Sequence, residues 1–187
     1  MDLGLKDATA VVVGGGRGMG LAAARCLAGD AARVALVGRS RDVLDSAAAD
    51  LSERGSPDAI GIVADVADEH QARQVFDEIA NRWGGELNIL INTVGPAVQG
   101  GFEQLSDDQW RNAVDGGVLG MVHCVRSALP LLRRAAWARI VNFSAQSTQR
   151  QSPNLVAYTA AKAMVTSVSK NLSQLLAPDE IMVNVVS

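Results

Sequence analysis

The sequence predicts an α/β fold, in which a doubly wound parallel β-sheet carries helices on both faces. Short apolar runs rich in valine, isoleucine and leucine alternate with segments of helical periodicity along all 187 residues. Runs that are apolar on both faces are typical of strands in a parallel sheet, because helices cover such a sheet on both sides. The chain shows no internal repeat or linker, so residues 1–187 are expected to form one domain with a sizeable core.

Six segments have the length and composition of buried strands. They are short and mostly β-branched or aliphatic, and helical patterns separate them, so the connections between neighbouring strands are expected to be crossovers. The expected ranges are Ala8–Val13, Arg33–Val37, Ala59–Val63, Leu87–Ile91, Arg139–Phe143 and Ile181–Val186.

Helix start and stop signals lie between these strands. Ser40 and Asp68 are expected to cap the second and third helices, and the capping box Ser106–Gln109 opens a long fourth helix. Pro130 is expected to kink or end that fourth helix, and Pro178 to end the last helix.

A glycine-rich turn joins the first strand to the first helix. Glycines let a backbone approach an anion closely, and a helix N-terminus offers free N–H groups and the positive end of the helix dipole. A glycine cluster alone could be only a tight turn, but its place between strand and helix favours binding of a dinucleotide. The candidate residues are Gly14, Gly16, Arg17, Gly18, Met19 and Gly20.

The residues after the second strand indicate which dinucleotide is expected. An acidic residue at this place usually accepts a hydrogen bond from the ribose 2′-OH. Here the strand is followed by Gly38, Arg39 and Ser40, without a carboxylate. A guanidinium suits a 2′-phosphate, and Arg17 of the glycine turn could flank the same group. The alternative is that both are solvated surface arginines, but their two positions favour NADP over NAD.

Tyr158 and Lys162 are four residues apart on the last predicted helix, which places both on one helix face. A free phenol has a pKa of about 10 and is a weak acid–base group at neutral pH, whereas a nearby ammonium favours the phenolate. The pair is therefore a candidate proton donor and acceptor. Taken alone, two surface side chains would explain the spacing equally well.

With these motifs in order, the whole chain resembles the short-chain dehydrogenase/reductase family, which has an extended Rossmann fold. Asp65 and Val66 match the family's adenine-binding pair, and the segment Asn92–Gly95 is similar to the family segment after the fourth strand. The resemblance implies that Asn92 and Gly95 contribute to cofactor binding, together with Tyr158 and Lys162, which match the catalytic pair. It also implies a homo-dimer or homo-tetramer formed through the two long helices.

The same resemblance implies a reaction. An NADP-dependent oxidoreductase would transfer a hydride between nicotinamide and a small-molecule ketone, aldehyde or secondary alcohol. Tyr158 would act as general acid or base, and Lys162 would bind the nicotinamide ribose and assist the tyrosine. The alternative function is a dinucleotide-binding protein of this fold with little or no turnover, acting as a sensor or oligomer partner.

Three departures from the family pattern bear on this chemistry. Ala145 stands where the family has its catalytic serine, which leaves Ser144, or Ser147 if the following loop folds back, as a substitute. Gly117 stands where the family has an asparagine, and two consecutive glycines there could preserve the distortion that relatives show in this helix. Family members also continue past the position of Ser187, so the C-terminal part of the fold is expected to be missing.

Composition argues against several other classes of function. A net charge of −3 gives no electrostatic reason to expect a nucleic-acid partner. The N-terminus lacks the pattern of a signal peptide and no apolar run is long enough to cross a bilayer, so the cytoplasm is the expected location and a membrane partner is not expected. Cys26 and Cys124 show no metal-binding or redox spacing, and no metal site is expected.

Overall fold

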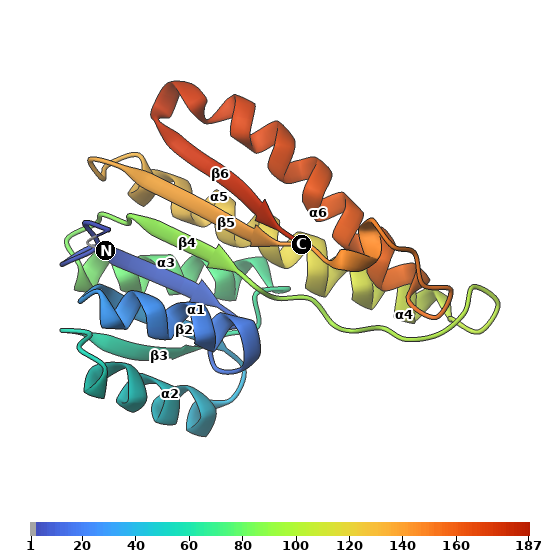
Figure 1. Cartoon of the computed structure of the whole chain (residues 1–187), viewed down its shortest axis with the longest axis horizontal. Coiled ribbons are helices and arrows are strands. Elements are labelled where there is room, and N and C mark those ends of the chain that lie inside the picture. The colour runs from blue at the N-terminus through green and yellow to red at the C-terminus, as the bar shows by residue number, and fades with distance from the viewer. Residues whose placement is uncertain (1–2) are drawn as a thin grey trace.

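A computed structural model describes residues 3–187 and confirms the predicted fold class (Figure 1). Its sheet has six parallel strands in the order β3-β2-β1-β4-β5-β6. Each strand lies within two residues of its predicted range. The strands are β1 (Thr9–Val13), β2 (Arg33–Gly38), β3 (Ala59–Val63), β4 (Ile89–Asn92), β5 (Ala138–Phe143) and β6 (Ile181–Val186).

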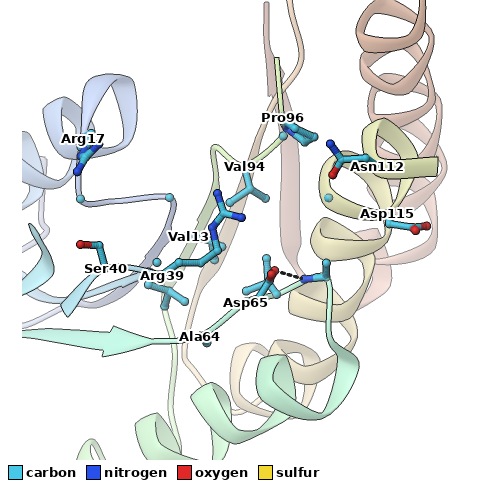
Figure 2. Close-up of a pocket in the computed structure, with 18 of the residues that line it drawn as sticks. Val13, Arg17, Arg39, Ser40, Ala64, Asp65, Val94, Pro96, Asn112 and Asp115 are labelled. Carbon is cyan, nitrogen blue, oxygen red and sulfur yellow. Dashed lines mark hydrogen bonds between the residues drawn. The ribbon is translucent and has the colours of Figure 1, made fainter. Parts of the chain in front are cut away.

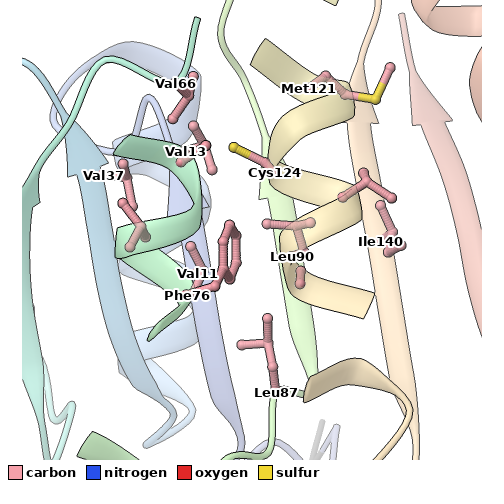
Figure 3. Close-up of a cluster of buried hydrophobic side chains, with 14 of the residues drawn as sticks. Val11, Val13, Val37, Val66, Phe76, Leu87, Leu90, Met121, Cys124 and Ile140 are labelled. Carbon is pink, nitrogen blue, oxygen red and sulfur yellow. The ribbon is translucent and has the colours of Figure 1, made fainter. Parts of the chain in front are cut away.

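Helices cover the sheet on two sides, and the central strands bury side chains on both. In β1, Ala10 and Val12 join the core beneath α1 and α2, whereas Val11 and Val13 join the core beneath the other helices. Figure 3 shows part of this second core, in which Phe76 and Leu90 are fully buried. The helices are α1 (Gly18–Gly29), α2 (Arg41–Glu53), α3 (Glu69–Arg82), α4 (Asp107–Val114), α5 (Gly120–Leu132) and α6 (Val156–Leu175), with short 3₁₀ turns at Gln146–Thr148 and Ala177–Asp179.

The helix caps test the predicted start signals directly. Asp68 accepts hydrogen bonds from the backbone N–H groups of His70 and Gln71, and Ser106 forms the full capping box. Ser40 lies at the N-cap position of α2, but its side chain makes no capping hydrogen bond, so the prediction that it caps the helix is wrong. Because Ser40 borders the cleft described below, its hydroxyl is exposed instead.

The long helix predicted from Ser106 is not continuous. After α4 the chain forms a π-helical turn, Asp115–Leu119, before α5 begins. Gly116 and Gly117 lie in this turn, and glycine is a weak α-helix former that tolerates such a distortion. A Cβ atom at Gly116 would lie 2.9 Å from Cδ of Pro96, so the glycine lets the loop after β4 pack closely against this turn. Pro130 lies inside α5, which ends two residues later.

The sheet order creates a crevice at one edge. The chain leaves β1 towards β2 on one side and returns at β4 on the other, so the connections on either side of this point run in opposite directions. In open α/β sheets, ligands bind outside the carboxyl ends of the strands at such a switch point. The glycine turn after β1 and the loops after β2, β3 and β4 all begin at this edge.

Within residues 3–187, no helix combines the length and the apolar character needed to cross a membrane.

The close packing of the glycine turn against α1 can be tested by substitution at Gly20. A Cβ atom at Gly20 would lie 2.5 Å from the carbonyl oxygen of Gly14, whereas at Gly29, on the same helix, it would meet nothing within 4 Å. Gly20→Ala should lower the free energy of unfolding by about 1–3 kcal/mol, because the backbone must shift. Gly29→Ala should leave it unchanged or raise it by up to about 1 kcal/mol. Urea unfolding followed by circular dichroism measures both, and equal effects would contradict the packing described.

Candidate active site

A cleft of about 760 Å³ lies at the carboxyl ends of the strands around the switch point (Figure 2). It brings together residues from four separate loops. Eight of the predicted residues line it, namely Gly14, Gly16, Arg17, Arg39, Ser40, Asp65, Val66 and Gly95. Residues of α4 and of the turn after it complete the wall, namely Asp108, Arg111, Asn112, Asp115 and Gly116. No local pattern marked the α4 residues of this group, because only the tertiary fold brings α4 to the cleft.

The glycine turn has the form expected of a phosphate-binding loop. Gly14 and Gly18 have positive φ angles of 79° and 54°, a region that favours glycine. No side chain caps α1 and no acidic residue lies in its first turn, so an anion can approach its N-terminal N–H groups. Met19 and Gly20 do not line the cleft: the side chain of Met19 is exposed, and Gly20 packs beneath the turn.

The arginines expected to bind a 2′-phosphate are both at the cleft. Figure 2 shows Arg39 reaching into it from the end of β2, with Arg17 on the glycine turn and Ser40 at the border. Among the described residues, neither Arg17 nor Arg39 forms an ion pair. The two guanidinium groups are therefore available to a phosphate.

Asp65 and Val66 both line the cleft, but Val66 also packs into the hydrophobic core. The Asp65 carboxylate accepts a hydrogen bond of 3.1 Å from the backbone N–H of Ala67, drawn in Figure 2, and the Asp65 N–H donates to Gln71 Oε1 at 3.0 Å. Val66 is only 6% exposed and joins the core. The pair thus offers a fixed carboxylate to a ligand in the cleft.

Lys162 is the most constrained charged group of the site. Its side chain is buried, and Nζ donates to the carbonyl oxygens of Val94 at 3.0 Å and Phe143 at 2.8 Å. Burial lowers the pKa of Lys162 to about 8. An ammonium has three N–H donors, so one remains for a further acceptor. The ring of Tyr158 lies close by, with its centroid 5.9 Å from Nζ.

Gly95 connects Lys162 to the cleft. It has φ of 148°, and a Cβ atom there would lie 3.1 Å from Lys162 Nζ. Gly117 packs against Gly95 on another side, since a Cβ atom at Gly117 would lie 3.8 Å from Gly95 Cα. Tyr158 and Lys162 do not themselves line the cleft, but Lys162 Nζ contacts the carbonyl oxygen of Val94, which does.

Asn92 occupies a different place from the other predicted cofactor residues. It is 3% exposed and does not line the cleft; its Nδ2 donates to Asn142 Oδ1 at 2.8 Å. Asn142 in turn donates to Ser169 Oγ at 2.8 Å, so a buried polar chain joins β4, β5 and α6. Asn92 Oδ1 is buried without a partner among the described residues. Sequence reasoning missed Asn142 and Ser169, whose roles depend on contacts 50 and 27 residues apart.

Both serines proposed as substitutes for the residue at position 145 form hydrogen bonds with α6. Ser144 is buried, and its hydroxyl contacts the carbonyl oxygen of Lys162 at 3.0 Å and Thr166 Oγ1 at 2.7 Å. Ser147 Oγ accepts a hydrogen bond of 2.9 Å from Thr159 Oγ1. Ser144 therefore supports the turn of α6 that carries Lys162, and the substitute role of Ser144 or Ser147 stays a prediction.

Comparison with known proteins identifies the family. The profile described as short chain dehydrogenase matches residues 8–187, and the chain belongs to this family of oxidoreductases. An uncharacterized oxidoreductase of Staphylococcus aureus (strain MW2) is 29% identical over 184 residues, covering 98% of this chain and 78% of the relative. The oxidoreductase YvrD of Bacillus subtilis (strain 168) is 25% identical over 186 residues, covering 100% of this chain and 69% of the relative.

Solved structures of similar fold contain both kinds of nicotinamide cofactor. L-Sorbose reductase from Gluconobacter frateurii, complexed with NADPH and L-sorbose, superposes with a TM-score of 0.95 at 26% identity, covering 99% of this chain and 70% of the other. NAD⁺-bound xylitol dehydrogenase gives a TM-score of 0.93 at 26% identity, covering 98% and 70%. The family therefore uses NAD or NADP, and likeness of fold does not decide between them.

The buried lysine predicts a pH-dependent stability. Its pKa of about 8 in the folded protein lies below the reference value of 10.5, so between these values the unfolded chain binds more protons. The resulting penalty, about 3 kcal/mol, is present in full below pH 8 and disappears as the pH rises towards 10.5. Relative to Lys162→Met, wild-type protein should therefore gain unfolding free energy between pH 7 and 10 in urea titrations. A difference between the two proteins that does not change with pH would contradict this assignment.

Proposed function

We propose that this chain is an NADP-dependent oxidoreductase that interconverts a small-molecule carbonyl compound and the corresponding alcohol. The observation that carries the proposal is the buried Lys162, which lies between the catalytic candidate Tyr158 and the wall of the cleft. A buried ammonium is costly unless its donors are satisfied. One donor beyond the two backbone carbonyls is available to a ribose hydroxyl.

The preference for NADP rests on the charges around the end of β2. Arg39 projects into the cleft, Arg17 faces it from the glycine turn, and β2 ends without a carboxylate that could accept from a 2′-OH. An unpaired guanidinium favours a phosphate, whereas an NAD-binding site normally has an acid here.

The chain's own groups provide the proton chemistry. A nicotinamide nucleotide, when bound, supplies or accepts the hydride. Tyr158 is proposed to give the substrate oxygen its proton in reduction and to take it back in oxidation. Lys162 remains largely cationic at neutral pH even with its pKa near 8, and a cation beside the phenol favours the phenolate. Wall residues of the cleft would exclude water from one side of the site.

One donor expected in relatives is absent, and this supports a second candidate function. Ala145 has no hydroxyl, and Ser144 and Ser147 are bonded within the fold. Loss of a donor to a developing oxyanion typically costs about 10²–10³ in rate. A nucleotide-binding protein with little or no turnover is therefore the alternative.

The assembly is also a proposal. The contacts of α6 with α4 and with the π turn place these helices side by side. In a homo-dimer or homo-tetramer, the exposed surface of these helices would form the contact between copies.

Cofactor preference can be tested at Arg39. Arg39→Asp should weaken NADPH binding by about 10-fold to 100-fold, because a charge-assisted contact is replaced by repulsion, while NADH binding changes little. Nucleotide fluorescence titrations measure both. Arg41→Asp is a matched control with the same change of charge, since Arg41 donates to the Gly61 carbonyl and does not line the cleft. Equal losses for the two nucleotides would contradict the assignment.

Turnover can be tested with NADPH and a panel of ketones, followed by absorbance. Tyr158→Phe should lower the rate by at least about 10²-fold, because the proton donor is removed, while NADPH binding weakens by no more than about tenfold, the contribution of one hydrogen bond. Ala145→Ser should raise the rate by restoring a donor to the substrate oxygen. If the wild type binds NADPH but neither it nor Ala145→Ser turns over any ketone, the binding-protein alternative is correct.

A further inference from the structure

One face of α5 contacts the segment that connects β3 to α3. Gly120, His123 and Arg126 are three residues apart and therefore share this face. Gly120 and His123 contact Val66, which lines the cleft, and Arg126 contacts Glu69, three residues further along the chain.

The three contacts differ in strength. Arg126 pairs with Glu69 at 3.2 Å, but both side chains are more than 60% exposed, and such pairs add little. At Gly120 a Cβ atom would lie 3.1 Å from Val66 Cγ2, so the glycine lets α5 pack closely against Val66. This apolar contact does not orient the Val66 backbone. His123 Nδ1 lies 3.0 Å from the Val66 carbonyl oxygen in a half-buried position. Because a carbonyl only accepts, this nitrogen carries the proton and donates it.

The hydrogen bond from His123 acts on a single peptide group. The oxygen of the Val66–Ala67 peptide accepts from His123, and the N–H of the same peptide donates to the Asp65 carboxylate at 3.1 Å. A peptide group is planar, so fixing its oxygen also fixes the direction of its N–H. The orientation of the Asp65 carboxylate at the cleft therefore depends on His123, although His123 does not line the cleft.

We propose that His123 is a positioning residue for the adenosine part of the bound nucleotide. The inference rests on the proposed function, because it assumes that the cleft beside Asp65 and Val66 receives this part of the ligand. His123 sets the Val66–Ala67 peptide, and that peptide sets the carboxylate. Without the imidazole donor, the peptide is free to rotate and the Val66 carbonyl loses a half-buried partner, which has a cost in free energy.

The test compares three variants of the full chain. His123→Leu keeps an apolar body but removes the donor. His123→Asn restores one, because the amide nitrogen is as many bonds from Cβ as Nδ1 is. Arg126→Ala is the control, since it removes a contact from the same helix face that is not joined to the Val66–Ala67 peptide. The ligands are NADPH and adenosine 2′,5′-bisphosphate, which lacks the nicotinamide half, and the readout is the dissociation constant.

We expect His123→Leu to weaken both ligands by the same factor, about fivefold to tenfold, which corresponds to one hydrogen bond. His123→Asn should recover most of this loss, and Arg126→Ala should stay within about twofold of the wild type. A purely structural role would not produce an equal loss for the fragment with recovery in the asparagine variant. If wild type binds both ligands and His123→Leu binds them equally well, the inference is wrong while the proposed function stands. If wild type binds neither ligand, both are wrong.

Discussion

The buried ammonium of Lys162 is the interaction on which the candidate site depends. It joins three elements, because Nζ on α6 donates to the backbone just beyond β4, at Val94, and at the end of β5, at Phe143. Burying a charge in this way is unfavourable unless donors are satisfied, and the depressed pKa near 8 reflects the remaining cost. The ammonium fits here because residue 95 is a glycine. A Cβ atom at Gly95 would lie only 3.1 Å from Lys162 Nζ.

The site therefore has two parts with different physical character. The wide cleft carries unpaired arginines and a glycine turn that presents backbone N–H groups. The candidate pair of Tyr158 and Lys162 does not line this cleft, and Lys162 is almost fully buried. The proposed reaction has matching needs, since the phosphates of a dinucleotide need cations and N–H donors, whereas the substrate oxygen beside the nicotinamide needs a proton donor. This match supports the proposed function, which rests first on the buried Lys162.

Much of the fold could be predicted because local patterns determine it. Strands that are apolar on both faces predict a parallel sheet, and the caps at Asp68 and Ser106 depend on residues two or three positions away. The contacts that no local pattern predicted join residues far apart in the sequence. Ser144 turns towards α6 because Thr166 and the Lys162 carbonyl lie there, and the chain from Asn92 to Ser169 crosses three elements. The distortion at Gly116 and Gly117 is expected from the two consecutive glycines, but no local pattern predicts that Pro96 packs against Gly116.

The central claim is that the cleft binds a nicotinamide dinucleotide, with Lys162 at the ribose next to the nicotinamide. Isothermal titration calorimetry of the full chain with NADPH, run beside Lys162→Met, tests it most directly. The account predicts one nucleotide bound per chain, a lower affinity for NADH, and a clear loss of NADPH affinity in the variant, which lacks the ribose donor. Folded wild-type protein that binds neither NADPH nor NADH would contradict the account, and so would a Lys162→Met variant that binds NADPH with unchanged affinity.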